Sequence, residues 1–72
     1  MEIKLEEVFF PGQWEFFSED WSISAWEAPS GNGITCHIFS KHYPYTSGVI
    51  RGLKDIAAAE TAAQNYIMNY NK

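Results

Sequence analysis

The sequence predicts an α+β domain, an antiparallel three- to four-stranded meander with one C-terminal amphipathic helix packed on one face. Two observations lead to this class. Runs of alternating apolar and polar residues, separated by turn signals, fill residues 1–50. One long stretch with helical spacing of its apolar residues fills residues 53–70. Because the chain has only 72 residues, no repeats and no linker, we expect a single domain over residues 1–72.

The first strand is predicted where Ile3 and Leu5 alternate with charged residues, and it ends or bulges near Glu7. The pair Pro11-Gly12 then predicts a turn, because proline fixes φ and glycine accepts a positive φ. A second short strand follows, with one face formed by Trp14 and Phe16 and the other by Glu15 and Phe17.

Residues 21–27 and 34–40 are the clearest strands, and the turn-rich residues 28–33 join them. A symmetric hairpin through this loop brings the apolar faces of the two strands together, with Ile23 opposite Ile38 and Ala25 opposite Cys36. Residues 41–48 are predicted as a loop, since Pro44 argues against a central strand. Residues 49–50 form either a short strand or an anchor for the chain.

The helix over residues 53–70 has one apolar arc at roughly 100° per residue, formed by Ile56, Ala59, Ala62, Ala63, Tyr66, Ile67 and Tyr70. Asp55 is predicted as its N-cap. Ten of the twelve aromatic residues precede the helix, so we expect large rings of the sheet to pack on its alanines. The rival interpretation is a helix–helix interface, but no second helix is evident in the sequence.

Composition and charge indicate a compact, cytoplasmic protein. The single cysteine favours a reducing compartment, the N-terminus lacks signal-peptide character, and no apolar run is long enough for a membrane span. The net charge of −4 is uneven, because residues 1–27 hold seven carboxylates against one lysine. This half is either an ordinary solvated surface or an acidic face that meets a basic partner.

Catalysis, metal binding and a cofactor are not expected. Cys36 and His37 are neighbours on a predicted strand and point to opposite faces, so they form neither a metal site nor a nucleophile pair. We expect Cys36 to be buried and inert. The acidic pairs of residues 6–7 and 19–20 lack the shared cleft that acid–base catalysis needs.

The outer face of the predicted hairpin indicates a contact surface instead. Trp26, His37 and Phe39 face outward if the helix covers the other side, and large exposed aromatic residues are typical of protein interfaces. The sequence therefore predicts a non-catalytic protein-binding domain with six candidate contact residues, Glu15, Glu19, Asp20, Trp26, His37 and Phe39. Alternatively, the aromatic residues pack under the N-terminal segment, where Phe9, Phe10 or Phe17 reach them, or a homodimer hides them.

A second hypothesis is a small nucleic-acid-binding domain. Aromatic rings beside cations stack bases and neutralise phosphates, and one stretch offers this combination in Lys41, Tyr43, Tyr45 and Arg51. Four cations near this stretch in a net-acidic chain are a weak signal compared with a basic stripe. A loop whose tyrosines cover the core is the simpler interpretation. The third hypothesis is a homodimeric structural or regulatory protein.

Two resemblances accompany these patterns. The order of strands and helix, ending in the alanine-rich stretch of residues 57–66, resembles the DNA-binding domains of plant ethylene-response factors and recombinase arm domains. Those domains read DNA with an arginine-rich sheet, whereas this sheet offers Glu15, Glu27, Ser22, Ser24 and Thr35. In size, acidity and aromatic content the chain resembles small phage-encoded host-takeover and anti-defence proteins. That resemblance implies an inhibitor of a host nucleic-acid-handling protein.

Overall fold

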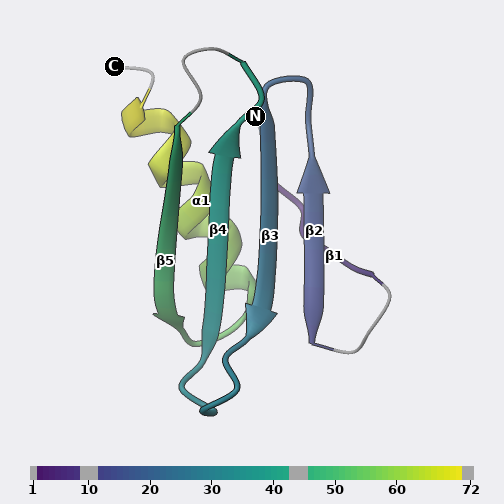
Figure 1. Cartoon of the computed structure of the whole chain (residues 1–72), viewed down its shortest axis with the longest axis vertical. Coiled ribbons are helices and arrows are strands. Elements are labelled where there is room, and N and C mark those ends of the chain that lie inside the picture. The colour runs from purple at the N-terminus through teal and green to yellow at the C-terminus, as the bar shows by residue number, and fades with distance from the viewer. Residues whose placement is uncertain (1, 9–11, 43–45, 71–72) are drawn as a thin grey trace.

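The computed structural model describes residues 2–8, 12–42 and 46–70. It shows a five-stranded antiparallel sheet followed by one helix (Figure 1). The elements, in chain order, are β1 (Glu6–Glu7), β2 (Gln13–Phe17), β3 (Trp21–Glu27), β4 (Ile34–Ser40), β5 (Ser47–Leu53) and α1 (Ile56–Tyr70). The α+β class, the meander and the C-terminal helix are confirmed. The predicted number of three to four strands is corrected to five.

Each strand pairs with its neighbour in sequence, so the sheet order is β1-β2-β3-β4-β5. The predicted β3/β4 hairpin is confirmed residue by residue, with Ile23 opposite Ile38 and Ala25 opposite Cys36. These four side chains are fully buried. The turn closes through Gly31 and Gly33, which both take positive φ and so relieve the tight reversal of strain.

The strand β5 is longer than the sequence indicates. It covers seven residues, whereas the two adjacent apolar residues Val49 and Ile50 support only a short strand. Its ladder with β4 carries a bulge, because two β5 residues, Arg51 and Gly52, lie opposite the single residue Thr35. Gly52 takes φ +75 there, a conformation in which glycine is unstrained.

The helix α1 begins at Ile56, three residues after the predicted start, because Leu53 still belongs to β5. Asp55 is the N-cap as predicted, and its Oδ1 accepts a hydrogen bond from the Ala58 N–H at 2.8 Å. Three residues of the predicted apolar arc are fully or nearly fully buried: Ala59, Ala63 and Ile67. Tyr70, the last residue of that arc, is instead exposed.

Trp21 brings a large ring against the helix, although its ring contacts are with tyrosines and the prediction placed such rings on the alanines. It packs edge-on against Tyr66 and Tyr70, with ring centroids 6.3 Å and 5.2 Å apart. These aromatic pairs join the start of β3 to the C-terminal half of α1. The sheet face toward α1 is therefore the core of the molecule.

The N-terminal segment corrects the predicted first strand. Only Glu6–Glu7 pair as a strand, whereas Ile3 and Leu5 are buried outside any ladder. The Leu5 N–H donates to Glu60 Oε2 of α1 at 2.7 Å, so this segment lies on the helix side of the sheet, behind β2 and β3 in Figure 1. The Leu5 N–H thus finds its hydrogen-bond acceptor in the Glu60 carboxylate of α1 rather than in a neighbouring strand. Across residues 2–8, 12–42 and 46–70, no helix is both long and apolar enough to span a bilayer.

Candidate functional site

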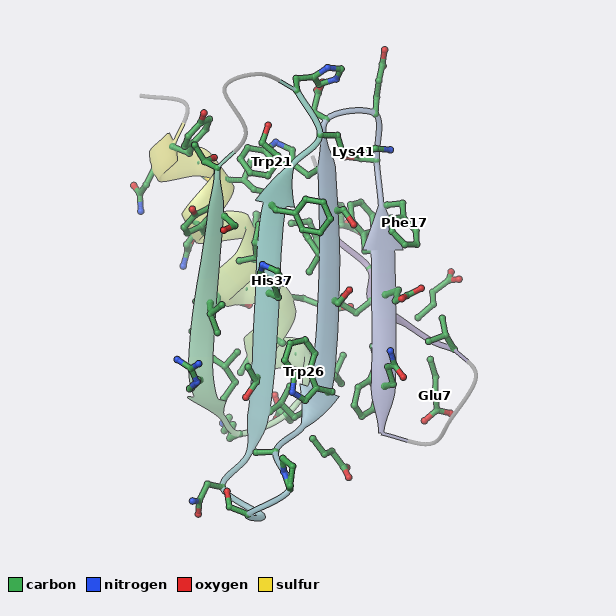
Figure 2. All side chains as sticks on the ribbon, viewed as in Figure 1. Glu7, Phe17, Trp21, Trp26, His37 and Lys41 are labelled. Carbon is green, nitrogen blue, oxygen red and sulfur yellow. The ribbon has the colours of Figure 1, made fainter. Side chains whose placement is uncertain are left out.

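The two faces of the sheet are covered differently. The helix α1 and the N-terminal segment cover one face (Figure 1), and no part of the described chain lies over the opposite face, which we call the open face. Figure 2 looks onto the open face, with Phe17, Trp26 and His37 labelled along it. Strand alternation along β2, β3, β4 and β5 assigns it twelve side chains: Gln13, Glu15, Phe17, Ser22, Ser24, Trp26, Thr35, His37, Phe39, Ser47, Val49 and Arg51.

The strand register arranges these side chains in rows across the sheet. The first row runs Phe17, Ser22, Phe39, Ser47, and the second runs Glu15, Ser24, His37, Val49. The third row runs Gln13, Trp26, Thr35, and then reaches the bulge at Arg51. On the central strand β3, Ser22 therefore lies between Phe17 and Phe39, and Ser24 lies between Glu15 and His37. Trp26 is the third open-face residue of this strand.

Several large apolar side chains on the open face are accessible to solvent. Phe17 is 60% exposed, Phe39 is 38% exposed and Val49 is 45% exposed. His37 lies beside Phe39 at a ring-centroid distance of 5.5 Å. Ser22 is only 5% exposed beneath its neighbours. The open face therefore presents exposed aromatic rings on either side of a buried serine.

An open hollow of about 560 Å³ adjoins Trp26 at the hairpin end of this face. Its lining combines the indole ring with polar groups of the hairpin loop and of β5, including Asn32, Thr35 and Arg51. It is wide enough to receive a large side chain and offers both an aromatic wall and a cation.

Four of the six predicted contact residues share the open face: Glu15, Trp26, His37 and Phe39. The buried residues Ile3 and Leu5 lie on the helix side, and Glu6–Glu7 pair beside β2 at the edge of the sheet, so this segment does not lie over Trp26, His37 or Phe39. Phe9 and Phe10, which the alternative also invoked, fall outside the described residues. Phe17 stands in the same row as Phe39 and extends the aromatic surface.

The other two predicted contact residues, Glu19 and Asp20, lie at the turn between β2 and β3. His42 binds this turn, with its Nε2 3.1 Å from the Glu19 carbonyl oxygen and 3.1 Å from Asp20 Oδ1. The carboxylates are therefore at the Phe17 and Phe39 end of the sheet, and Asp20 already has a neighbour that is a cation when protonated.

Sequence reasoning omitted Phe17 and Val49 from the candidate site. The alternation of Phe17 with Phe16 already placed Phe17 away from the core, and only the register with β3 shows that it lies in line with Phe39. Val49 needed the full extent of β5, for which the sequence carries no strong signal.

The two edges of the sheet carry opposite charges, with carboxylates on β1 and β2 and an arginine on β5. Glu6 of β1 stands directly opposite Glu15 of β2, so two carboxylates lie side by side next to Phe17. Like charges in such a pair disfavour the fold slightly. Arg51 carries the opposite charge on the far strand β5. The acidic character of residues 1–27 thus becomes an acidic edge of the sheet.

The basic-aromatic stretch does not come together within the described part of the chain. Lys41 follows the end of β4, where its Nζ donates to the Ser18 carbonyl at 2.9 Å. Arg51 lies toward the other end of the sheet, since Ser47 to Arg51 alone spans about 13 Å of strand. Tyr43 and Tyr45 fall outside the described residues.

The chemistry of Cys36 is that of a core residue. Its side chain is fully buried on the helix face, while the next residue, His37, lies on the open face. Burial raises the pKa of the Cys36 thiol to about 11, because desolvation disfavours the thiolate. The predicted inward position of Cys36 is confirmed. Among the residues that the structure describes, no three His, Cys, Asp or Glu side chains are grouped to hold a metal ion.

No family model matches this chain, and no curated protein or solved structure is similar enough to count as a match.

Proposed function

We propose that this chain is a non-catalytic protein-binding domain that binds its partner through the open face. The observation that carries the proposal is the set of three large aromatic side chains, Phe17, Trp26 and Phe39, on a sheet face that the described chain leaves uncovered. Monomeric proteins rarely expose such groups together without a use. Aromatic residues in contact with pockets also supply most of the energy in protein interfaces.

The size of the open face suits a compact interface. Four strands at a spacing of about 4.8 Å and seven residues at about 3.4 Å give a flat area of roughly 460 Å². Functional apolar patches on small proteins have areas of about 300–600 Å². The surrounding loops and the acidic edge then serve as the polar rim of the interface.

The charge of the acidic edge favours a basic partner. Glu6, Glu15 and the turn carboxylates Glu19 and Asp20 surround the Phe17 end of the open face. Charge of this kind accelerates encounter and selects among partners, while the aromatic contacts supply the affinity. The narrower form of the proposal is an inhibitor, of phage or prophage origin, that occupies the phosphate-binding site of a host nucleic-acid-handling protein.

The test is a tagged pull-down from bacterial lysate with nuclease, comparing the wild-type chain with Trp26→Ser and Phe39→Ser. We expect one stoichiometric partner for the wild type and at least a tenfold loss of capture for each variant, since hot-spot residues cost about 2 kcal/mol or more. Met68→Ser is the matched control, because Met68 is 59% exposed on α1, away from the open face. Equal capture by all four chains excludes the open face as the binding surface.

A nuclease-sensitive result favours nucleic acid instead. Capture that disappears with nuclease, together with a shift of labelled DNA or RNA that weakens with salt, supports the domain built on Lys41, Tyr43, Tyr45 and Arg51. Absence of any shift at low salt removes that alternative.

A further inference from the structure

The two edges of the sheet differ in how they are closed. At one edge the two-residue strand β1 covers part of β2 with two glutamates, a short and charged arrangement that discourages further pairing. At the other edge, within the part of the chain that the structure describes, β5 pairs only with β4. It is seven residues long, contains no proline and carries one charge, Arg51. This edge has the features of a strand that accepts a partner.

The ladder identifies the backbone groups that β5 leaves free. The Ser40 N–H donates to the Thr46 carbonyl at 2.9 Å, and hydrogen-bonded pairs alternate along an antiparallel ladder. The residues Gly48 and Ile50 therefore bond to β4. The N–H and C=O groups of Ser47 and Val49 point away from the sheet, and the same alternation assigns this direction to those of Arg51, the first residue of the bulge.

We propose that a second copy of this chain binds this edge, with the two β5 strands antiparallel about a two-fold axis at Val49. In that register Val49 faces Val49 of the other copy, and Ser47 faces Arg51 in both directions. Each pair joins residues whose backbone groups are free, so the three pairs form complete hydrogen-bonded pairs. Small apolar side chains meet at the axis and no like charges are opposed. The edge is thus complementary to itself.

One flank of α1 faces this partner. Tyr66 packs over Gly48, where an added Cβ would lie 2.6 Å from the ring, so one flank of α1 borders the β5 edge. At 100° per residue, that flank continues through uncharged residues, namely Ala58, Ala62, Asn65 and Asn69. Two such flanks can approach across the axis without opposing charges. The product is one ten-stranded sheet with both helices on the same side.

Disulfide trapping tests the register directly. Val49→Cys places two thiols across the axis in a pair with Cα atoms about 5.5 Å apart, within disulfide range. Native Cys36 is fully buried and does not compete. We expect mild oxidation to convert most of the variant to a linked dimer on non-reducing gels. Phe39→Cys is the matched control, because it is exposed on the same face but more than about 14 Å from its symmetry mate.

Sedimentation equilibrium then measures the association without a cross-link. We expect Ser47→Glu to lower the dimer Kd roughly two- to thirtyfold through two new pairs with Arg51. Ser47→Arg should raise it, and Val49→Lys should abolish the dimer while the uncharged Val49→Thr keeps it. A wild-type chain that stays monomeric up to about 1 mM overturns the proposal. The proposal is also overturned if Phe39→Lys dissociates the dimer while Val49→Lys leaves it intact. Equal cross-linking of the Val49→Cys and Phe39→Cys variants overturns it as well.

Discussion

Cys36 lies in the core, with no exposed surface, in the same buried cluster as Ala59 and Ala63 of α1. Its position explains why a single cysteine in this chain is structural. The thiol packs as a small apolar group, and its raised pKa keeps it protonated at neutral pH.

The raised pKa of Cys36 predicts a loss of stability in alkaline solution. The folded thiol has a pKa of about 11 and the unfolded thiol titrates near 9.0, so the unfolded chain loses its proton first. The free energy of unfolding is therefore unaffected by this group below pH 9 and decreases between pH 9 and 11. Urea titrations of the wild type and Cys36→Ala across this range measure the effect, which the variant should lack. Parallel profiles for the two chains contradict it.

At the scale of single elements, β5 and α1 depend on one close contact. Gly48 has no side chain, and the Tyr66 ring occupies the space that a Cβ would take, at 2.6 Å. The ring covers a glycine on an edge strand, where the sheet would otherwise lose apolar contact. The residue pair thus fixes how closely the helix approaches β5.

Gly48→Ala should destabilise the fold by roughly 1–3 kcal/mol, because the added methyl group displaces the Tyr66 ring. In a Tyr66→Ala background the same change should cost little or even stabilise, since alanine restricts the unfolded chain more than glycine does. Urea denaturation of the four chains of this double-mutant cycle measures the coupling. An equal cost of Gly48→Ala in both backgrounds would show that Tyr66 is not the obstacle.

The elements also show where sequence patterns are sufficient. The β3/β4 register was predictable because a glycine-rich loop sits symmetrically between two strands with strict alternation, and the helix cap because Asp55 precedes an unbroken helical period. The N-terminal segment was mispredicted because Ile3 and Leu5 alternate like a strand, although their burial comes from lying beside α1. Alternation alone does not distinguish a paired strand from an extended segment on a core.

The candidate site also has a part that the sequence predicts and a part that it does not. Trp26, His37 and Phe39 could be assigned to one face from local alternation and one hairpin. Their neighbours Phe17 and Val49 depend on the registers of β2 and β5, which the sequence does not determine. To predict a site that spans four strands, the register of each strand pair must be known. Where one register is uncertain, the residues of that strand cannot be assigned to the site.

For the molecule as a whole, Glu60 links the two parts that cover the core. Its carboxylate accepts the Leu5 N–H at 2.7 Å, and this bond joins residues 55 positions apart in the sequence. The helix covers β4 and β5, while Ile3 and Leu5 complete the core with Trp14 and Phe16 of β2 packed against it.

Glu60→Ala should reduce the unfolding free energy by roughly 1–3 kcal/mol, because a partly buried N–H loses its acceptor. For a chain of this size each kcal/mol corresponds to about 4–8 °C in Tm. Thermal unfolding measures the change, and amide exchange at Leu5 should accelerate in the same variant. Gln64→Ala, one turn further along α1, is the matched control. Equal shifts in both variants mean that the Leu5 bond contributes nothing specific.

The strand order has a consequence for how the chain folds. Every strand pairs with its immediate neighbour, so the hairpins require only short loop closures and form early. The bond between Leu5 and Glu60 must wait until α1 exists, because its partners are 55 positions apart in a chain of 72 residues. Until then the rings of Trp14 and Phe16 lack their final cover. The nearly complete sheet without its N-terminal segment is therefore the species most prone to aggregate during synthesis.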